Sequence, residues 1–597
     1  MKYRYHIITA MMLLTAALTS CSGNRTESIP TTVGSETTSE ETVQYPETES
    51  FESEGILFSA RSGFYDSDIA LFLSADDGRN IYYTLDGSMP TADSTAYTEP
   101  IIITDRSSEP DVLAAHSDIA QPADSSRDWL PQKPVDKATV VRAVAVSPDG
   151  TVSPAVSATY FIGFEDKADY YKDMTIISLM TDEEGLFDYD KGIYVLGKAY
   201  DDWKSGSEYD PETPYYFMPA NFTQKGRDWE RPATIQFFRN GVAELTQDVG
   251  IRIHGGATRS YPQKSFNIYA RSDYGLPKLD YDLFRGNVIS ESDKCPVTEF
   301  DTFMLRNGGN DAMYTRFRDK LVQRLAAGHD FLTQGTEPCI VFIDGEYWGH
   351  YEITEKIDDA YVSAHCGVPK KDVCIVKKEE LDEGSEETFA EWQELRDWVA
   401  AADLSDDAEY EKLCGLVDMQ SFMEYVSAEI YINNKNWDSS NMAMWKAQTT
   451  DDSNNFADGR WRFIMFDVDY STGIYGEALP NTDSFERLLN KECFLSDLLK
   501  AALHNETFRG EFSKTFMEIA DNDFSAERAN AETDRLSEEY KDMTKDTYNR
   551  FWSGWFRDGA DEENYNEAVE MLRNFYNKRY EYIVKYLEEF LAEYSNT

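Results

Sequence analysis

The pattern of apolar residues changes twice along the chain, and these changes constrain the fold more than any single motif. Between residues 55 and 165, runs such as Thr139–Val146 and Val156–Ile162 alternate with turns and predict a small β-sandwich. From 170 to 500 strand-like and helix-like runs are mixed, and from 501 to 597 helical periodicity dominates. A chain of 597 residues also exceeds what one hydrophobic core can hold. We therefore expect an α+β protein in which a β-sandwich precedes a mixed domain with a helical C-terminal extension.

The N-terminus, residues 1–21, has the features of a bacterial lipoprotein signal peptide. Lys2 and Arg4 precede a short apolar run that ends in Leu-Thr-Ser-Cys21. This ending resembles the lipobox, where the cysteine receives a diacylglycerol. A plain signal peptide with an incidental cysteine is the alternative. Residues 22–54, rich in Ser, Thr and Glu, predict a disordered acidic tether. The folded part would then be extracytoplasmic, with the lipid as its only attachment to the membrane.

Charge and cysteine content exclude several classes of protein. The chain has 57 Lys and Arg against 109 Asp and Glu, a net charge of -52. Such a balance opposes nucleic-acid binding, because phosphate contacts need clustered basic residues. The 7 cysteines are scattered, without a CxxC pair, which argues against a zinc ribbon or a disulfide-dense scaffold.

Three segments place polar groups beside the ends of predicted strands, where sites usually form. In the first, a strand that ends at His254 enters a Gly255-Gly256 turn, and Lys264 lies near the start of the next strand. A glycine turn lets backbone N–H groups approach phosphate, and a lysine adds positive charge. An ordinary turn with a solvent-facing lysine is the alternative.

The second segment, Asn433 to Asn441, follows a predicted helix. Asp438 could orient or deprotonate a hydroxyl group, and the amide oxygen of Asn441 could hold a metal ion. The competing interpretation is that these Asn and Asp side chains cap the turns of their own backbone.

The third segment, Trp461 to Gly473, begins with the predicted strand Trp461 to Val468, and Asp467 and Asp469 lie at the end of this strand. Two residues apart in a strand, these carboxylates extend from one face. They repel each other unless a cation lies between them or one is protonated. Mg²⁺ or Mn²⁺ fits such oxygen ligands, whereas one solvent-facing and one turn-capping aspartate is the alternative.

The order of these segments is that of a protein kinase site, and their residues resemble the CotH family of atypical secretory protein kinases. The resemblance covers about residues 170–500. It rests on five blocks in order: Arg252 to Arg259 with Pro262 to Phe266, Arg306-Asn to Arg318-Asp-Lys, Val341 to Asp358, Asn436 to Asn441, and Phe466 to Asp469.

The resemblance implies a two-lobed kinase-like domain that uses ATP and Mg²⁺ or Mn²⁺ to phosphorylate Ser or Thr of surface or secreted proteins. Asp438 would be the catalytic aspartate, and Asn441, Asp467 and Asp469 would bind the metal ions. The ATP-binding residues carried over by motif are Gly255, Gly256, Arg259, Lys264 and Glu355. The HRD and DFG motifs of ordinary kinases are absent. Asp319 lies on the expected helix over 314–327, but the sequence does not pair it with Lys264.

The segments Tyr82 to Thr91 and Val141 to Val146 resemble the small β-sandwich at the C-terminus of chitobiases. This resemblance implies a spacer or docking module, or alternatively a glycan-binding one. Two other functions remain open for the whole chain. One is a non-catalytic surface scaffold that binds glycans or coat proteins, such as those of a spore coat. The other is a metal-dependent nucleotidyl-type transferase that uses the same carboxylates.

Overall fold

A computed structural model describes residues 48–595, with gaps at 77, 121–128, 165–166, 439 and 553–559. The predicted signal peptide, Cys21 and most of the tether lie outside the described residues. The end of the predicted tether is folded, because strand β1 (Phe51–Ser53) pairs with β2 (Ile56–Phe58). The rings of Phe51 and Phe58 stack with centroids 5.0 Å apart. The folded part therefore begins before residue 55.

The N-terminal module is the expected β structure. β9 (Thr139–Val146) and β10 (Val156–Ile162) occupy the predicted ranges and pair antiparallel. β9 also pairs with β6 (Asn80–Thr84). Opposite them, β4 (Ile69–Leu71) pairs with β8 (Ile101–Ile103). These strands share one apolar core, whose members include Ile56, Phe58, Ile69, Leu71, Ile103, Val141, Ala143 and Tyr160.

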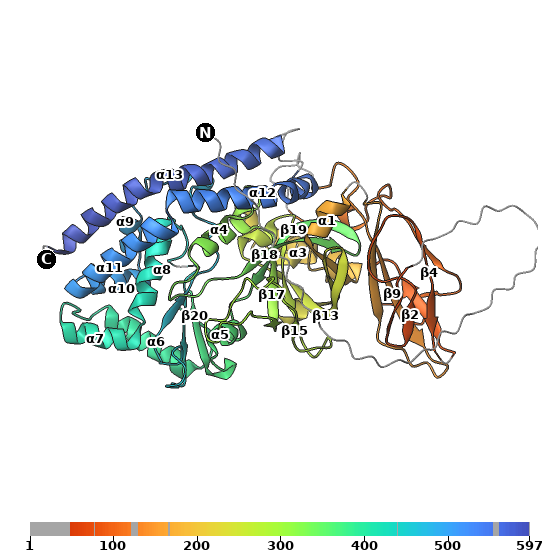
Figure 1. The fold of residues 1–597 in the computed structure, drawn as a ribbon, viewed down its shortest axis with the longest axis horizontal. Helices are drawn as coiled ribbons and strands as arrows, with labels where there is room; N and C mark the ends of the chain where they lie inside the picture. Colours follow the sequence, from red (N-terminus) through yellow and green to blue (C-terminus); the bar gives the residue numbers. More distant parts are fainter. Residues whose placement is uncertain are drawn as a thin grey trace, which may run out of the picture. The chain divides into compact units, whose positions relative to one another are not determined.

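The central domain is built on strands that form a closed ring (Figure 1). The ring runs β12 (Arg231–Arg239), β11 (Thr175–Thr181), β18 (Thr336–Ile343), β19 (Glu346–Glu355), β17 (Thr302–Arg306), β14 (Ser265–Tyr269) and β13 (Val242–His254). Pairing of β12 with β13 closes it, so no edge strand is left free. Val242 also pairs with Gly63 of β3 (Gly63–Tyr65), which joins the ring to the N-terminal module.

The hairpin of β18 and β19 confirms the turn expected at Asp344-Gly345. Both residues have positive φ, 48° and 89°, as a two-residue hairpin turn requires. The Asp344 carboxylate accepts a hydrogen bond of 2.8 Å from the backbone N–H of Thr181, which fixes the turn against β11.

Two predicted elements are shorter than expected because of their backbone angles. Helix α4 begins at Arg318 and ends at Leu325, since Arg316 has a φ of 67°, which no right-handed helix allows. The strand predicted over 461–468 is reduced to β23 (Arg462–Ile464). Asp467 has a φ of 54°, so the chain has left the extended conformation before the two aspartates.

The remainder of the chain is a small sheet covered by helices (Figure 1). The sheet contains β21 (Glu380–Glu383), β20 (Val373–Lys377), β22 (Ala443–Ala447) and β23. The helices are α5 (Asp359–Cys366), α6 (Glu386–Val399), α7 (Asp407–Leu416), α8 (Met419–Tyr431), α9 (Ser484–Leu489), α10 (Phe494–Ala502), α11 (Glu506–Glu518), α12 (Ala526–Phe551) and α13 (Ala560–Ser595).

The predicted helical character of the C-terminal region is confirmed. α12 packs on α13, on α4 and on β19, and the backbone N–H of His350 donates to Thr547 Oγ1 at 2.8 Å. The last helices are thus part of the central domain's core. Among the helices that the structure describes, none is both long and apolar enough to cross a bilayer.

His329 links three elements of this core and predicts a pH-dependent stability. Its Nε2 lies 2.9 Å from Asp523 and its Nδ1 lies 3.3 Å from Glu424. Although burial lowers it, hydrogen bonds to these carboxylates raise the pKa of His329 to about 9. The folded pKa exceeds the unfolded value of about 6.5, so the added stability is complete below pH ~6.5 and is lost as the pH rises through ~9.

We expect the free energy of unfolding to fall by up to about 3 kcal/mol over that interval. His329→Gln should remove most of this slope in urea unfolding measured at several pH values. The exposed His504 provides the control, since His504→Gln should leave the slope unchanged. An equal slope in wild type and His329→Gln would contradict the assignment.

Candidate active site

Asp467 and Asp469 are brought together by an arginine that the sequence analysis did not assign to the site. Arg306, the last residue of β17, donates from Nη2 to Asp467 Oδ1 at 2.6 Å and to Asp469 Oδ2 at 3.1 Å. Its Nη1 donates to Asp319 of α4. One guanidinium therefore joins the strand ring, helix α4 and the loop after β23.

Asp469 lies at the bottom of this site. Its side chain is 1% exposed, whereas that of Asp467 is 42% exposed. Asn310 donates to it twice, from Nδ2 at 2.7 Å and from the backbone N–H at 3.1 Å. Burial, followed by repulsion from Asp467, raises the pKa of Asp469 to about 7, against the attraction of Arg306. Two close carboxylates thus share less than two full negative charges near neutral pH.

The two residues before Asn310 are glycines, and the absence of a side chain at Gly309 leaves room for the Asp469 carboxylate. Gly308 and Gly309 have φ values of 92° and 59°. A Cβ atom on Gly309 would overlap the Asp469 carboxylate. The run Arg306-Asn-Gly-Gly-Asn310 combines a basic residue at a strand end with a glycine pair. A glycine pair after a strand is also the reason to predict a phosphate-binding turn at Gly255-Gly256. The same pattern could have identified the loop at Gly308-Gly309.

Positive charge gathers on the same side of the ring. His254, at the end of β13, is neutral because burial lowers its pKa to about 3, with further contributions from Arg306, Arg259, Lys356 and Lys377. Two of these cations are paired with carboxylates, since Lys356 lies 2.9 Å from Asp358 and Lys377 lies 2.6 Å from Asp382.

Asn441 lies at this site, as predicted, because its Nδ2 donates to the backbone carbonyl of Asp467 at 3.0 Å. Asp438 belongs to the same turn but contacts α9 instead. Its Oδ2 accepts from Arg487 at 2.5 Å, and Lys491 lies 3.8 Å from its Oδ1. Among the described residues, no hydrogen bond or ion pair joins Asp438 to Asp467 or Asp469.

The Asp438 side chain is buried, and some of the polar atoms in and around it have no hydrogen-bond partner among the described residues. Asp438 Oδ1 and Glu429 Oε1 are both buried without a hydrogen-bond partner among the described residues. Burial, with a smaller contribution from Asp438, raises the pKa of Glu429 to about 8, so this neighbour is neutral at pH 7. Asp438 therefore faces two cations, Arg487 and Lys491, and the neutral carboxyl group of Glu429 acts on it from nearby.

Lys264 and Arg259 are predicted to contact phosphate, but in the structure both donate hydrogen bonds to backbone carbonyls. Lys264 is fully buried, and its Nζ donates to the carbonyls of Arg259 and Tyr261, both at 2.8 Å. The ammonium also lies 3.8 Å from the centre of the Phe222 ring. Burial, and then repulsion from Arg259, holds the pKa of Lys264 well below its usual range.

Arg259 likewise binds backbone carbonyls. It donates to Gly255 at 2.6 Å and to Phe222 at 3.0 Å. Both cations thus fix the loop that carries Gly255 and Gly256. Gly255 has a φ of 109°, and nothing lies within 4 Å of a Cβ built on Gly256, so the turn itself is open on that side.

The Glu355 side chain also binds other groups within the protein. Its two carboxylate oxygens bind His365 Nε2 and the backbone N–H of Gly335, each at 2.8 Å. Both oxygens thus have partners within the protein, while Glu355 also lines a cavity of about 330 Å³, so its predicted contact with ATP stays a prediction.

A substitution of Lys264 can distinguish its structural role from the predicted role in phosphate binding. Lys264→Met should lower the free energy of unfolding by about 1–3 kcal/mol, because two buried carbonyls lose their donor. The dissociation constant for ATP should change by less than about threefold, since the ammonium contacts no free surface. Urea unfolding and calorimetric titration with ATP measure the two quantities. If Lys264→Met instead bound ATP tenfold more weakly at unchanged stability, the result would support a role of Lys264 in phosphate binding.

The residues around Arg306 fit a divalent cation. The guanidinium shows that the space between Asp467 and Asp469 accepts positive charge, and carboxylate oxygens are the ligands that Mg²⁺ and Mn²⁺ prefer. In the described part of the chain, no group of three or more His, Cys, Asp or Glu side chains is arranged so that it could hold a metal ion by itself. Further ligands would therefore come from Asn441 or from a bound phosphate.

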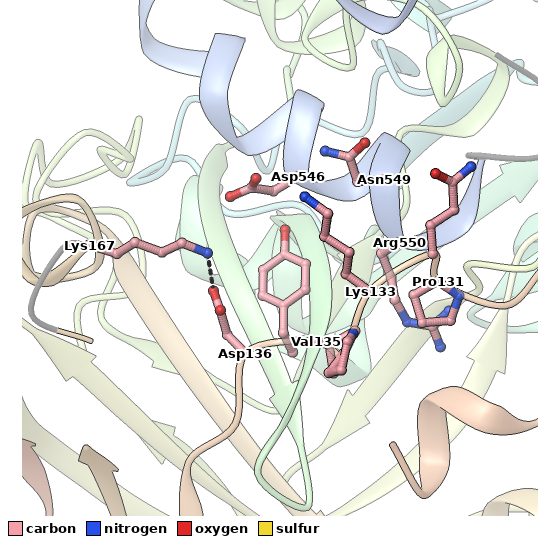
Figure 2. A pocket seen from close by; sticks show the side chains of 11 residues that line it. Pro131, Lys133, Val135, Asp136, Lys167, Asp546, Asn549 and Arg550 are labelled. Atoms are coloured by element: carbon pink, nitrogen blue, oxygen red, sulfur yellow. Dashed lines mark hydrogen bonds and ion pairs between the residues drawn. The ribbon is translucent and has the colours of Figure 1, made fainter. Parts of the chain in front are cut away.

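A separate cavity of about 290 Å³ lies where residues 131–136 meet β19 and α12 (Figure 2). Its lining includes Lys133, Asp546 and Asn549, and Lys167 is paired with Asp136 at 2.7 Å on one side. None of the predicted site residues lines it.

A strand arginine paired with a helix carboxylate lies beside two aspartates from later in the chain, which resembles the arrangement of cations and carboxylates in a kinase site. The family model described as CotH kinase protein matches residues 251–583, and the chain belongs to this family. The α+β fold and the resemblance inferred from sequence are thereby confirmed. A second model, described as Fn3 associated, matches residues 69–160 of the N-terminal module. Comparison with curated proteins gave no match.

Proposed function

We propose that the protein is an ATP- and metal-dependent kinase that phosphorylates Ser or Thr hydroxyls of surface or secreted proteins. The observation that supports this function best is the position of Arg306, which holds Asp319, Asp467 and Asp469 around one cation site. Phosphoryl transfer needs little besides such positioning and charge stabilisation.

Each residue of the site then has a definite task. Asp467, Asp469 and Asn441 hold the metal, which when bound neutralises charge on the transferred phosphoryl group. Arg306, oriented by Asp319, holds the phosphates of ATP.

Asp438 accepts the proton of the acceptor hydroxyl at Oδ1, while Arg487 holds Oδ2. The Asp438 carboxylate is closed to solvent here, so this step requires the side chains of α9 to move aside.

We also propose export and anchoring through Cys21. Incorporation of a radiolabelled fatty acid in a bacterial host, lost in Cys21→Ser, would support the anchor. Labelling that persists in the variant would contradict it.

The function is tested by incubating the full-length protein with γ-labelled ATP and Mg²⁺ or Mn²⁺, with a general acceptor protein and with itself as substrate. Asp438→Asn and Asp467→Asn should each reduce label transfer at least about 100-fold. The exposed Asp210→Asn serves as the control and should transfer label normally. Absence of both label and ATP binding would contradict the kinase proposal and favour a surface scaffold. Transfer of AMP, seen in the product mass, would indicate a nucleotidyl transferase.

A further inference from the structure

The cation position between the two aspartates is already filled by the protein itself. Nη2 of Arg306 bridges Asp467 Oδ1 and Asp469 Oδ2, and the Arg306 side chain is only 12% exposed. The partner on its other nitrogen, Asp319, belongs to α4 and is 14% exposed. A guanidinium held by three carboxylates in a site largely shielded from water is bound firmly.

A divalent ion would need the oxygen atoms that Arg306 and Asn310 now use. Asp469 Oδ1 accepts from Asn310 Nδ2 at 2.7 Å, and Asp469 Oδ2 accepts from both Asn310 and Arg306. Asp467 Oδ1 accepts from Arg306. Of the four carboxylate oxygens of Asp467 and Asp469, only Asp467 Oδ2 accepts no hydrogen bond from the described residues. One free oxygen is too few for an ion that takes six or more ligands.

Entry of the ion therefore requires that Arg306 leave, and leaving is costly without a new anion. Removing one partner from a buried ion pair leaves an uncompensated charge. Most neighbouring side chains on this side are cations, namely Arg259, Lys356 and Lys377. The further carboxylate that acts on Arg306 is Glu352, which already lies 3.1 Å from His350. The phosphates of a nucleotide would supply the new anion, and Arg306 would keep Asp319 as its second partner.

We propose that Arg306 occupies the metal position while nucleotide is absent, so that a divalent ion binds tightly only together with a polyphosphate nucleotide. The inference rests on the proposed ATP and metal use of the site. It adds that metal and nucleotide binding are positively coupled through one arginine. Coupling between two ligands is reciprocal, so each ligand should strengthen the other by the same factor.

The test is Mn²⁺ binding to the full-length protein, measured by electron paramagnetic resonance with and without a non-hydrolysable ATP analogue. In wild type we expect the analogue to tighten Mn²⁺ binding at least about tenfold. Arg306→Gln should bind Mn²⁺ without nucleotide at least about tenfold more tightly than wild type, and the analogue should then change the affinity much less. Arg285→Gln, which breaks an ion pair with Glu337 outside the site, provides the matched control.

The outcomes separate this inference from the proposed function. Equal Mn²⁺ affinity in wild type with and without the analogue would overturn the coupling, while metal and nucleotide use would stand. No Mn²⁺ binding by wild type under either condition would overturn the proposed function, and the inference with it. The wild-type measurement decides the coupling by itself if Arg306→Gln fails to fold, as judged by circular dichroism.

Discussion

Asp469→Asn is expected to reduce phosphoryl transfer by about 10³-fold or more while leaving the protein folded. The carboxylate is buried between Asn310 and Arg306, and it is the deeper of the two acidic groups in the site. A neutral amide removes the charge that would hold a metal ion, and losses of this size follow removal of one preorganised charged group. We expect the protein to stay folded because Arg306 keeps Asp319 and Asp467 as partners when Asp469 loses its charge.

Label transfer from γ-labelled ATP and the midpoint of thermal unfolding measure the two effects. Asp469→Glu provides a second comparison, since it retains the charge but lengthens the side chain in a buried space. If Asp469→Asn transferred label at the wild-type rate, Asp469 could not be part of the site. Unfolding of Asp469→Asn would show that the carboxylate has a structural role instead.

Gly309→Ala is expected to disrupt both the site and the local fold. Gly309 has a φ of 59°, and a Cβ atom there would overlap Asp469 Oδ2 and lie 3.2 Å from Arg306 Nη2. The carboxylate or the loop must move, and the backbone strain of a left-handed alanine adds about 1 kcal/mol. We expect the free energy of unfolding to fall by about 2–4 kcal/mol and label transfer to fall at least about 100-fold.

Gly510→Ala is the matched control for this substitution. Gly510 lies inside α11, and a Cβ atom there would meet nothing within 4 Å. Alanine is the better helix former, so Gly510→Ala should raise the free energy of unfolding by about 0.5–1 kcal/mol and leave activity unchanged. Urea unfolding of the two variants measures the contrast. Wild-type stability and activity in Gly309→Ala would contradict the close packing described for Asp469.

The sequence predicted the elements of the fold well where the signal was local. β9, β10 and the turn at Asp344-Gly345 are where alternation and turn chemistry place them. The start of α4 and the end of β23 differ from expectation, because positive φ values at Arg316 and Asp467 are set by surrounding contacts.

The sequence also predicted that Asp467 and Asp469 lie beside a cation, but it did not identify Arg306 as that cation. Two aspartates two residues apart after an apolar strand predict a cation between them, and this follows from local repulsion alone. Lys264 was the expected basic residue because of its sequence neighbourhood. In the folded protein its ammonium is covered by Phe222 and bound to two carbonyls.

The chain by itself thus determined the class of fold, the order of the motifs and the acidic half of the candidate site. Only the tertiary structure decided that Arg306, 161 residues before Asp467, is the cation between the aspartates and that Asp319 is its partner. It also decided that Asp438 faces Arg487. The physical reason is that periodicity and turns reflect neighbours along the chain, whereas the pairing of buried charges depends on which distant elements the closed ring and helices bring together.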